Sequence, residues 1–272
     1  MNILLQRFLK SFFIFILFLT LGRCGVGENP MDMQTFAGII NGIGYVLENP
    51  IDTIEIPADL FMGKWYQIYK EAINFDVYRT QMYCPIAYFK PNSVMGEDGF
   101  SLEEAYRVTS KNGPIDTFKR DLNKVGPGKY WMYTEEYFYP KQFYIIKAGP
   151  NYDNATVDSV DIQYLVVTDG SRLSLMVYAR DPQQYFQKYN KEVVEFLEKA
   201  GFGGKVFWNK PKPLYQGPDC EWPTEREVFM RRALKNYEVN RKAANATEPS
   251  PSAIADLLKN PQLALQKLVQ MH

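Results

Sequence analysis

The middle of the chain alternates between short β-prone segments and turns. Between Phe61 and Arg180, eight segments rich in aromatic and β-branched residues are separated by clusters of Gly, Pro, Asn and Asp. Asp169-Gly170 is the strongest hairpin signal among them. Because no helical periodicity interrupts these segments, we predict an all-β fold, an eight-stranded antiparallel up-and-down β-barrel with room for one small ligand. The predicted strands cover residues 62–72, 82–90, 102–110, 115–124, 129–137, 141–148, 160–168 and 172–180.

One helix is expected directly after the last strand. Pro182 suits a first helical turn, Gly201 suits the end of the helix, and apolar side chains recur between them at helical spacing. We expect this helix to pack on the outer wall of the barrel. Residues 203–222 are rich in Pro, Gly and Lys and indicate an extended strap, whereas residues 223–244 are typical of a charged helix.

The N-terminus has the pattern of a secretory signal peptide. Arg7 and Lys10 precede an apolar run over residues 12–21, which is too short to cross a bilayer about 30 Å thick. An uncleaved anchor is the alternative, and the two charges argue against it. We predict cleavage after Cys24, secretion to the extracellular space, and no transmembrane segment in the mature chain. The predicted parts are a signal peptide (1–24), an N-terminal extension (25–58), the barrel with its helix and strap (59–222), and a helical C-terminal extension (223–272).

Cleavage would leave two cysteines in an oxidising compartment. We therefore predict a disulfide between Cys84 and Cys220, which closes a loop of about 137 residues. The sequons at Asn154 and Asn245 predict a glycoprotein, as expected for a secreted chain.

Composition argues against several classes of function. The chain has 31 basic and 31 acidic residues and no dense basic patch, which speaks against nucleic-acid binding. The one histidine is the terminal His272, so a nucleophilic Ser or Cys has no plausible base, and zinc has no His/Cys cluster. Glu103 and Glu104 are adjacent on a predicted strand and should point to opposite faces, as solvent-facing charges. We predict no catalytic residue, metal or cofactor, and a barrel enzyme is the least favoured hypothesis.

Gly63-Lys64-Trp65 opens the first predicted strand, and Arg180 ends the last one. In a closed barrel these two strands are neighbours, so the guanidinium can lie over the indole ring in a cation–π contact. The guanidinium also has five donors for carbonyl groups of the nearby turn. Trp65 and Arg180 are therefore predicted to seal one end of the barrel, which is a structural role.

These residues carry a family resemblance. Gly63-x-Trp65, Arg180 before the helix, and the Cys84/Cys220 pair resemble the lipocalins in identity, order and spacing over about residues 60–220. The resemblance implies a disulfide that ties the strap to the barrel. The family's second motif is altered here: Asn151-Tyr152-Asp153 is better spaced for it than Thr168-Asp169-Gly170. The extensions on both sides resemble lipocalin-related secreted proteins of nematodes.

Strand alternation gives candidate ligand contacts. Met176 and Tyr178 share the parity of Arg180 and are predicted to face inward. For two strands the alternation leaves a choice, with Trp131 and Tyr133 set against Tyr130 and Met132, and Phe143 and Ile145 against Tyr144 and Ile146. The predicted ligand-binding residues are Trp131, Tyr133, Phe143, Ile145, Tyr164, Val166, Met176 and Tyr178. The competing interpretation is that these aromatic side chains simply fill the barrel.

The favoured function is binding or transport of a small hydrophobic ligand such as a lipid, fatty acid, retinoid or sterol-like molecule. The alternative is an extracellular matrix or protein-interaction component that uses the barrel as a scaffold. That hypothesis depends on residues 223–272, where the amphipathic stretch from Ile254 to Val269 would bind a matrix protein or a cell-surface receptor. The same stretch would otherwise pack on the chain's own barrel.

Overall fold

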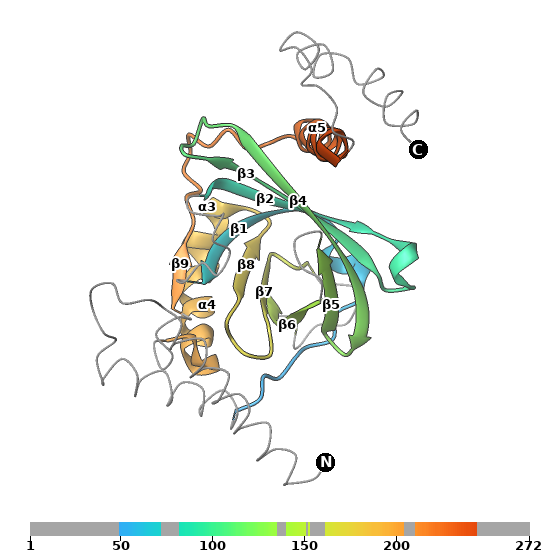
Figure 1. Ribbon diagram of the computed structural model, residues 1–272. Coiled ribbons are helices and arrows are strands. Elements are labelled where there is room, and N and C mark those ends of the chain that lie inside the picture. The colour runs from blue at the N-terminus through green and yellow to red at the C-terminus, as the bar shows by residue number, and fades with distance from the viewer. Residues whose placement is uncertain are drawn as a thin grey trace, which may run out of the picture. The chain divides into compact units, whose positions relative to one another are not determined.

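The computed structural model describes residues 49–71, 82–134, 140–150, 152, 161–203 and 210–243. Nine antiparallel strands form one sheet in the order β2-β3-β4-β5-β6-β7-β8-β1-β9, and β1 also pairs with β2, which closes the first eight into a barrel (Figure 1). The strands are β1 (Gly63–Glu71), β2 (Met82–Pro91), β3 (Phe100–Val108), β4 (Ile115–Gly126), β5 (Lys129–Thr134), β6 (Lys141–Gly149), β7 (Tyr164–Thr168), β8 (Leu175–Ala179) and β9 (Pro211–Pro213).

The predicted barrel is confirmed, and each of its strands lies within a few residues of the predicted segment. The hairpin between β7 and β8 is also present, with Thr168 opposite Leu175. Its loop is longer than a two-residue Asp-Gly turn. The Asp169 carboxylate accepts hydrogen bonds from the backbone N–H groups of Ser171 and Leu173, at 3.1 and 2.9 Å, and so organises the longer loop.

The closed end of the barrel carries a plug from the preceding chain. The backbone N–H of Ile54 donates to the carbonyl of Ile145 at 2.9 Å, and Ile56 is buried in the barrel core. The short 3₁₀ helix η1 (Ala58–Phe61) follows and places Phe61 inside. Its last carbonyl accepts the indole N–H of Trp65 at 2.8 Å, so the plug and the first strand are joined directly.

Arg180 completes this seal as predicted. Its guanidinium lies 3.8 Å from the centre of the Trp65 ring. The two terminal nitrogens donate to the carbonyls of Lys64 and Met62 at 3.0 and 2.8 Å. Gly63 lies between these carbonyls at a φ of 101°, a conformation that favours glycine. The first and last barrel strands are thus joined by one side chain at the closed end.

A helical segment of several parts packs on the outside of β1, β7 and β8. It comprises α3 (Pro182–Gln184), the π-helical turns η5 (Tyr185–Tyr189) and η6 (Glu198–Phe202), and α4 (Asn190–Leu197) between them. Asp181 caps the start by accepting the Gln184 N–H at 2.8 Å. Val193 and Leu197 are fully buried on Ile68 and Val177, which confirms the predicted position of this helix.

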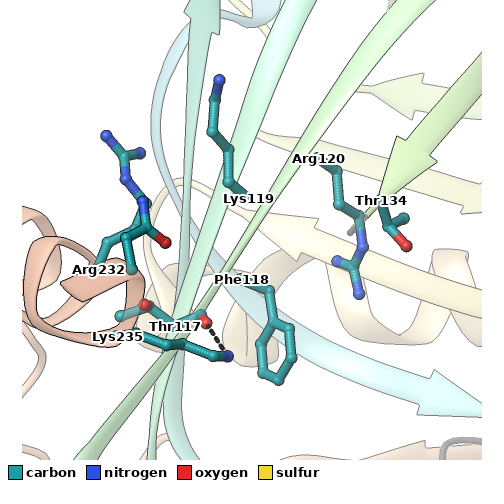
Figure 2. A pocket seen from close by; sticks show the side chains of 8 residues that line it. Thr117, Phe118, Lys119, Arg120, Thr134, Arg232 and Lys235 are labelled. Atoms are coloured by element: carbon teal, nitrogen blue, oxygen red, sulfur yellow. Dashed lines mark hydrogen bonds between the residues drawn. The ribbon is translucent and has the colours of Figure 1, made fainter. Parts of the chain in front are cut away.

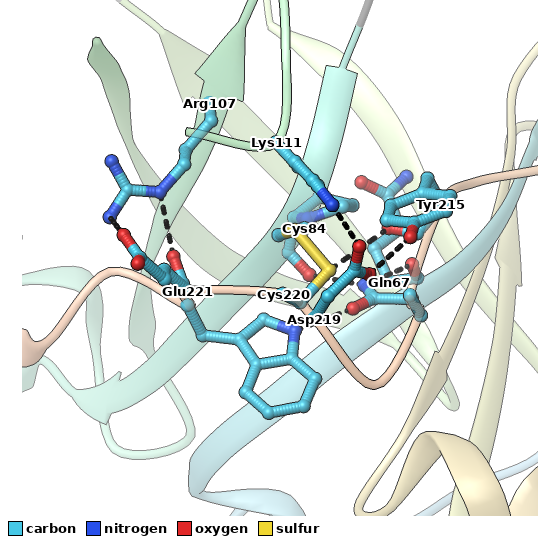
Figure 3. The surroundings of a disulfide bond; sticks show 11 residues. Gln67, Cys84, Arg107, Lys111, Tyr215, Asp219, Cys220 and Glu221 are labelled. Carbon is cyan, nitrogen blue, oxygen red and sulfur yellow. Dashed lines mark hydrogen bonds and ion pairs between the residues drawn. A yellow bond between two sulfur atoms is a disulfide. The ribbon is translucent and has the colours of Figure 1, made fainter. Parts of the chain in front are cut away.

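The strap returns across the barrel and is fixed by the predicted disulfide, Cys84–Cys220 (Figure 3). The Gln216 side chain donates to the carbonyls of Gln67 and Pro85, at 2.9 and 2.7 Å. On the other side of the disulfide, Arg107 donates to the Glu221 carbonyl at 2.7 Å. The strap is therefore joined to three strands of the barrel, β1, β2 and β3, by covalent and polar contacts together.

Beyond the strap, α5 (Glu225–Ala243) begins with a capping box. Thr224 donates its N–H and hydroxyl to the Glu227 carboxylate, both at 2.7 Å, and accepts the Glu227 N–H in return. Val228 then packs on Ile86 and Ala105, on the outer face of β2 and β3. Figure 1 shows α5 beside β3 and β4, so the charged helix predicted from residue 223 covers a second side of the barrel.

Several predictions concern residues outside the described part of the chain. These are the signal peptide at 1–24, the glycosylation sites Asn154 and Asn245, and the amphipathic stretch from 254 to 269. They stay predictions. Among the described helices, none is long and apolar enough to cross a membrane.

Candidate functional site

The half of the barrel interior next to the closed end is filled by aromatic side chains. Phe61, Phe89, Phe100 and Phe143 are essentially fully buried together with Trp65. Ring centres within this group lie 5.3–6.3 Å apart, mostly in edge-to-face arrangements. We call these five rings the aromatic floor. The alternative that aromatic residues fill the barrel therefore holds for its closed half.

A layer of polar side chains lies above the aromatic floor. Its members face inward from β1, β3, β4 and β8, and each is at least nine-tenths buried. We call this group the buried polar layer: Gln67, Lys70, Glu104, Arg120 and Tyr178. Burial of charge is costly unless it is paired and hydrogen-bonded.

Glu104 is the centre of this layer. Its carboxylate accepts the Tyr178 hydroxyl at 2.9 Å and forms an ion pair with Arg120. Tyr178 in turn packs edge-on against Phe89 of the aromatic floor, with ring centres 5.4 Å apart. One carboxylate from β3 thus joins side chains of β4 and β8 across the interior. The pairing compensates the burial of both charges and holds the tyrosine in place.

A bulge in β1 brings two residues into the layer. The pairing with β8 shifts between Gln67 and Tyr69, so that Gln67 faces Tyr178 and Lys70 faces Met176. The two residues between them turn outward toward the helix: Ile68 is fully buried there, and Tyr69 donates to Asn190 at 2.8 Å. The layer therefore contains two cations, Lys70 and Arg120, and one carboxylate, Glu104.

Four of the eight predicted ligand contacts do face the interior. Phe143 and Ile145 belong to the packed barrel core, and Tyr178 joins the aromatic floor to the polar layer. Met176 is only partly buried and packs against the same core, with its sulfur 3.1 Å from the Tyr178 hydroxyl. Their contact with a ligand stays a prediction.

The other four predictions of an inward direction were wrong. In β5 the inward residues are Tyr130 and Met132, so Trp131 and Tyr133 point outward, and Tyr133 is 44% exposed. Burial raises the pKa of the Tyr130 hydroxyl to about 12, so it stays protonated and neutral inside the barrel.

In β7 the inward residues are Leu165 and Val167. Tyr164 and Val166 lie beneath the outer helix instead, where the Tyr164 hydroxyl donates to Glu192 of α4 at 2.6 Å. The reason for the error is that the helix covers β7 from outside. Both faces of this strand are therefore apolar. Alternation of apolar and polar residues then does not show which side chains face the barrel interior.

Sequence reasoning missed the charged part of the site. Glu104 was assigned to solvent, although it shares strand parity with Leu102 and Phe100, two residues of the barrel core. This shared parity could have predicted that Glu104 faces the barrel interior. Arg120 likewise shares parity with the core residue Leu122 on β4. Within the described residues, no group of three His, Cys, Asp or Glu side chains is arranged to hold a metal ion.

Comparison with known proteins identifies the family. The sequence model described as a lipocalin domain matches residues 41–208, which is more than half of the chain. No curated protein matches this sequence.

Solved structures with similar chains include the cockroach major allergen Per a 4, at 12% identity, covering 61% of this chain and 92% of that one with a TM-score of 0.39. Lobster apocrustacyanin A1 is 14% identical, with coverage of 63% and 92% and a TM-score of 0.39. Japanin from Rhipicephalus appendiculatus, in a structure with cholesterol bound, is 11% identical, with coverage of 61% and 99% and a TM-score of 0.40. At these values the assignment depends on the family match and on the barrel itself, which together show that the chain belongs to the lipocalin family.

Proposed function

We propose that this lipocalin is a secreted protein that binds a small, largely hydrophobic ligand in the upper half of its barrel. The observation that carries the proposal is the buried polar layer above the aromatic floor. The aromatic floor fills the closed half of the barrel with side chains. We therefore expect the ligand between the polar layer and the opposite end of the barrel, where the β3–β4 and β7–β8 hairpins lie. An apolar interior with a few placed polar groups is typical of small-molecule sites.

The layer suggests how such a ligand is oriented. Its polar group is expected at Arg120, because a guanidinium donates to oxygen acceptors, while the Tyr178 hydroxyl donates its one proton to Glu104. The apolar remainder is expected against Met176, whose thioether adapts to irregular shapes. A fatty acid satisfies both requirements, and it belongs to the ligand classes expected from the sequence.

The test uses protein purified from the medium of cells that express the full chain. Lipids extracted from it are identified by mass spectrometry, and binding is measured by the fluorescence of cis-parinaric acid. N-terminal sequencing of the same protein is expected to begin at Gly25. Folded protein that carries no lipid and binds no probe would overturn the binding proposal, whatever the result on secretion.

Two variants test where in the barrel the ligand binds. Tyr178→Phe removes the hydroxyl that donates to Glu104, the partner of Arg120, and is expected to weaken probe binding about fivefold, the value of one hydrogen bond near 1 kcal/mol. Tyr133→Phe makes the same chemical change on the outer face, where the side chain is 44% exposed, and should leave affinity unchanged. Equal effects of both substitutions would argue against binding at the polar layer.

A second candidate function is capture of a matrix protein or receptor by the C-terminal extension. Phe229 and Val239 are exposed apolar side chains on α5 and favour it. Because Val228 of the same helix is buried on the barrel, a truncation must spare α5 and remove only residues 244–272. If that truncation, combined with Phe229→Ser and Val239→Ser, leaves localisation and partner capture intact, this candidate is wrong.

A further inference from the structure

A hollow of about 100 Å³ lies between β4 and α5 (Figure 2). Four of the side chains that line it are cationic. The residues that matter here are Thr117, Lys119, Arg120, Thr134, Arg232 and Lys235. Arg120 is shared with the buried polar layer, so the hollow adjoins the site proposed for the hydrophobic ligand at this one side chain.

The hollow follows from strand register. The pairing of β5 with β4 extends as far as Arg120 opposite Thr134, whereas β4 continues back to Ile115 beside β3. Along this stretch α5 approaches β4: Lys235 donates to the Thr117 carbonyl at 3.1 Å, and Arg231 donates to the Ile115 carbonyl at 3.0 Å. The helix therefore forms one wall and the strand the other.

The cations on the wall come from both elements. Arg232 and Lys235 are three residues apart on α5 and share one helix face, while Lys119 and Arg120 are consecutive on β4. The Lys235 ammonium also lies 4.1 Å from the centre of the Phe118 ring, which positions it beside the strand. Four positive side chains thus border a space large enough for several water molecules.

Each of the four cations has a carboxylate partner that is not part of the wall of the hollow. Lys119 lies 3.1 Å from Asp121, and Lys235 lies 3.6 Å from Asp116. The two arginines pair with neighbouring glutamates: Arg232 with Glu103, and Arg120 with Glu104. A lysine has three donors and an arginine five, so one carboxylate does not exhaust either. The partners hold the cations in position, and Lys119, Lys235 and Arg232 have more donors than these carboxylates accept.

The Thr117 hydroxyl is an independent indication of a ligand. Thr117 is 2% exposed, it lines the hollow, and its Oγ1 has no hydrogen-bond partner within the described residues. A buried hydroxyl that has lost its water and gained no partner destabilises the fold. An oxygen-rich ligand in the hollow would accept a hydrogen bond from it.

From these observations we propose that the hollow between β4 and α5 binds a tetrahedral oxyanion, a phosphate or sulfate group. Such a group offers acceptors in several directions, which suits the ammonium, guanidinium and hydroxyl donors that line the hollow. The group is either a free inorganic anion or a monoester on a small molecule. The variants that test the proposal are at residues of the hollow other than Arg120, because that side chain also belongs to the buried polar layer.

Isothermal titration calorimetry on the full chain separates these sources. The ligands are sodium phosphate, sodium sulfate, glycerol 3-phosphate and N-acetylglucosamine 6-sulfate, at constant ionic strength maintained with sodium chloride. Tighter binding of an ester than of its free anion identifies the ester as the natural form, and equal binding identifies the free anion. Absence of saturable binding for all four, in protein that is folded by circular dichroism, overturns the proposal.

Variants tie the binding to the hollow. Lys235→Met is expected to weaken the affinity about tenfold, as expected for one charge-assisted hydrogen bond. Arg226→Met removes an exposed cation from the same helix away from the hollow and should have no effect on affinity. Equal weakening by both variants would show unspecific attraction to a basic helix and would contradict a defined site.

Thr117→Val keeps the side-chain shape and removes only the hydroxyl. Without anion, the variant should melt at the same or a higher temperature, because an unpartnered buried hydroxyl is lost. With saturating anion, wild-type protein should gain more thermal stability than the variant, and the affinity of the variant should fall about fivefold. An unchanged affinity would show that Thr117 is merely a packing residue and would remove it from the site.

Discussion

Replacing Arg180 with methionine tests how the closed end of the barrel is held. Methionine keeps an unbranched apolar side chain but removes the contact with the Trp65 ring at 3.8 Å. It also removes both donors from the carbonyls of Met62 and Lys64. Burial lowers the pKa of Arg180, but the ordinary value for arginine is high enough that the side chain is charged in the folded protein.

The expected loss follows from these three contacts. A partly desolvated cation–π contact contributes about 1–2 kcal/mol. A hydrogen bond from a charged donor contributes about 1.5–3 kcal/mol, and there are two. Because Arg180 is only partly buried, water can hydrate the released carbonyls, and we expect a loss of about 3–5 kcal/mol in the free energy of unfolding. Arg180→Lys keeps the charge but lacks the planar fork, so it should lose about half as much.

Urea unfolding followed by tryptophan fluorescence measures both variants, with the slope of the transition as a check on two-state behaviour. Lys191→Met is a suitable control, since its side chain is 92% exposed on α4 and should change stability by less than about 0.5 kcal/mol. If Arg180→Met lost no more than this control, the closed end would be held by apolar packing alone. The assigned role of the guanidinium would then be wrong.

Two further predictions concern the strap and α5. Replacing Cys84 and Cys220 by serine opens a loop with a sequence separation of 136 residues and should cost about 5 kcal/mol in the chain-entropy model, measured by urea unfolding; a loss below about 1 kcal/mol would contradict it. At the start of α5, hydrogen bonds from Thr224 outweigh burial and hold the pKa of Glu227 below its ordinary 4.5. The stabilisation from Glu227 is therefore present above that pH and lost as pH falls through the lowered value, so the difference in melting temperature between wild type and Glu227→Gln should shrink in acid. A difference that persists unchanged to pH 3 would show that the charge of Glu227 is irrelevant.

The strand pattern was accessible from the sequence because turn residues interrupt it at regular intervals. The outer helix was accessible for a related reason, since Pro182 and Gly201 bracket a helical apolar period. The start of α5 was equally local, because Thr224 and Glu227 form a capping box over three residues. Such signals depend only on residues that are close together in the chain. They can therefore be recognised from a single sequence.

The direction of side chains in β5 and β7 was not accessible in this way. Trp131 and Tyr130 are both large aromatic residues, so alternation does not distinguish them. A shift of one residue in pairing moves every side chain of a strand to the other face. The register of a strand is set by all its cross-strand contacts together, and those exist only in the closed barrel.

By itself, the sequence determined the barrel, its seal at Trp65 and Arg180, and the covalent link between Cys84 and Cys220. Each of these depends on residue types that have few alternative uses. Only the tertiary structure decided that Glu104 pairs with Arg120 and Tyr178 inside the barrel, and that α5 encloses a cationic hollow on β4. The physical reason is that these groups come from strands and a helix far apart in the chain. Their charges become partners only when barrel closure and helix docking set the distances between them.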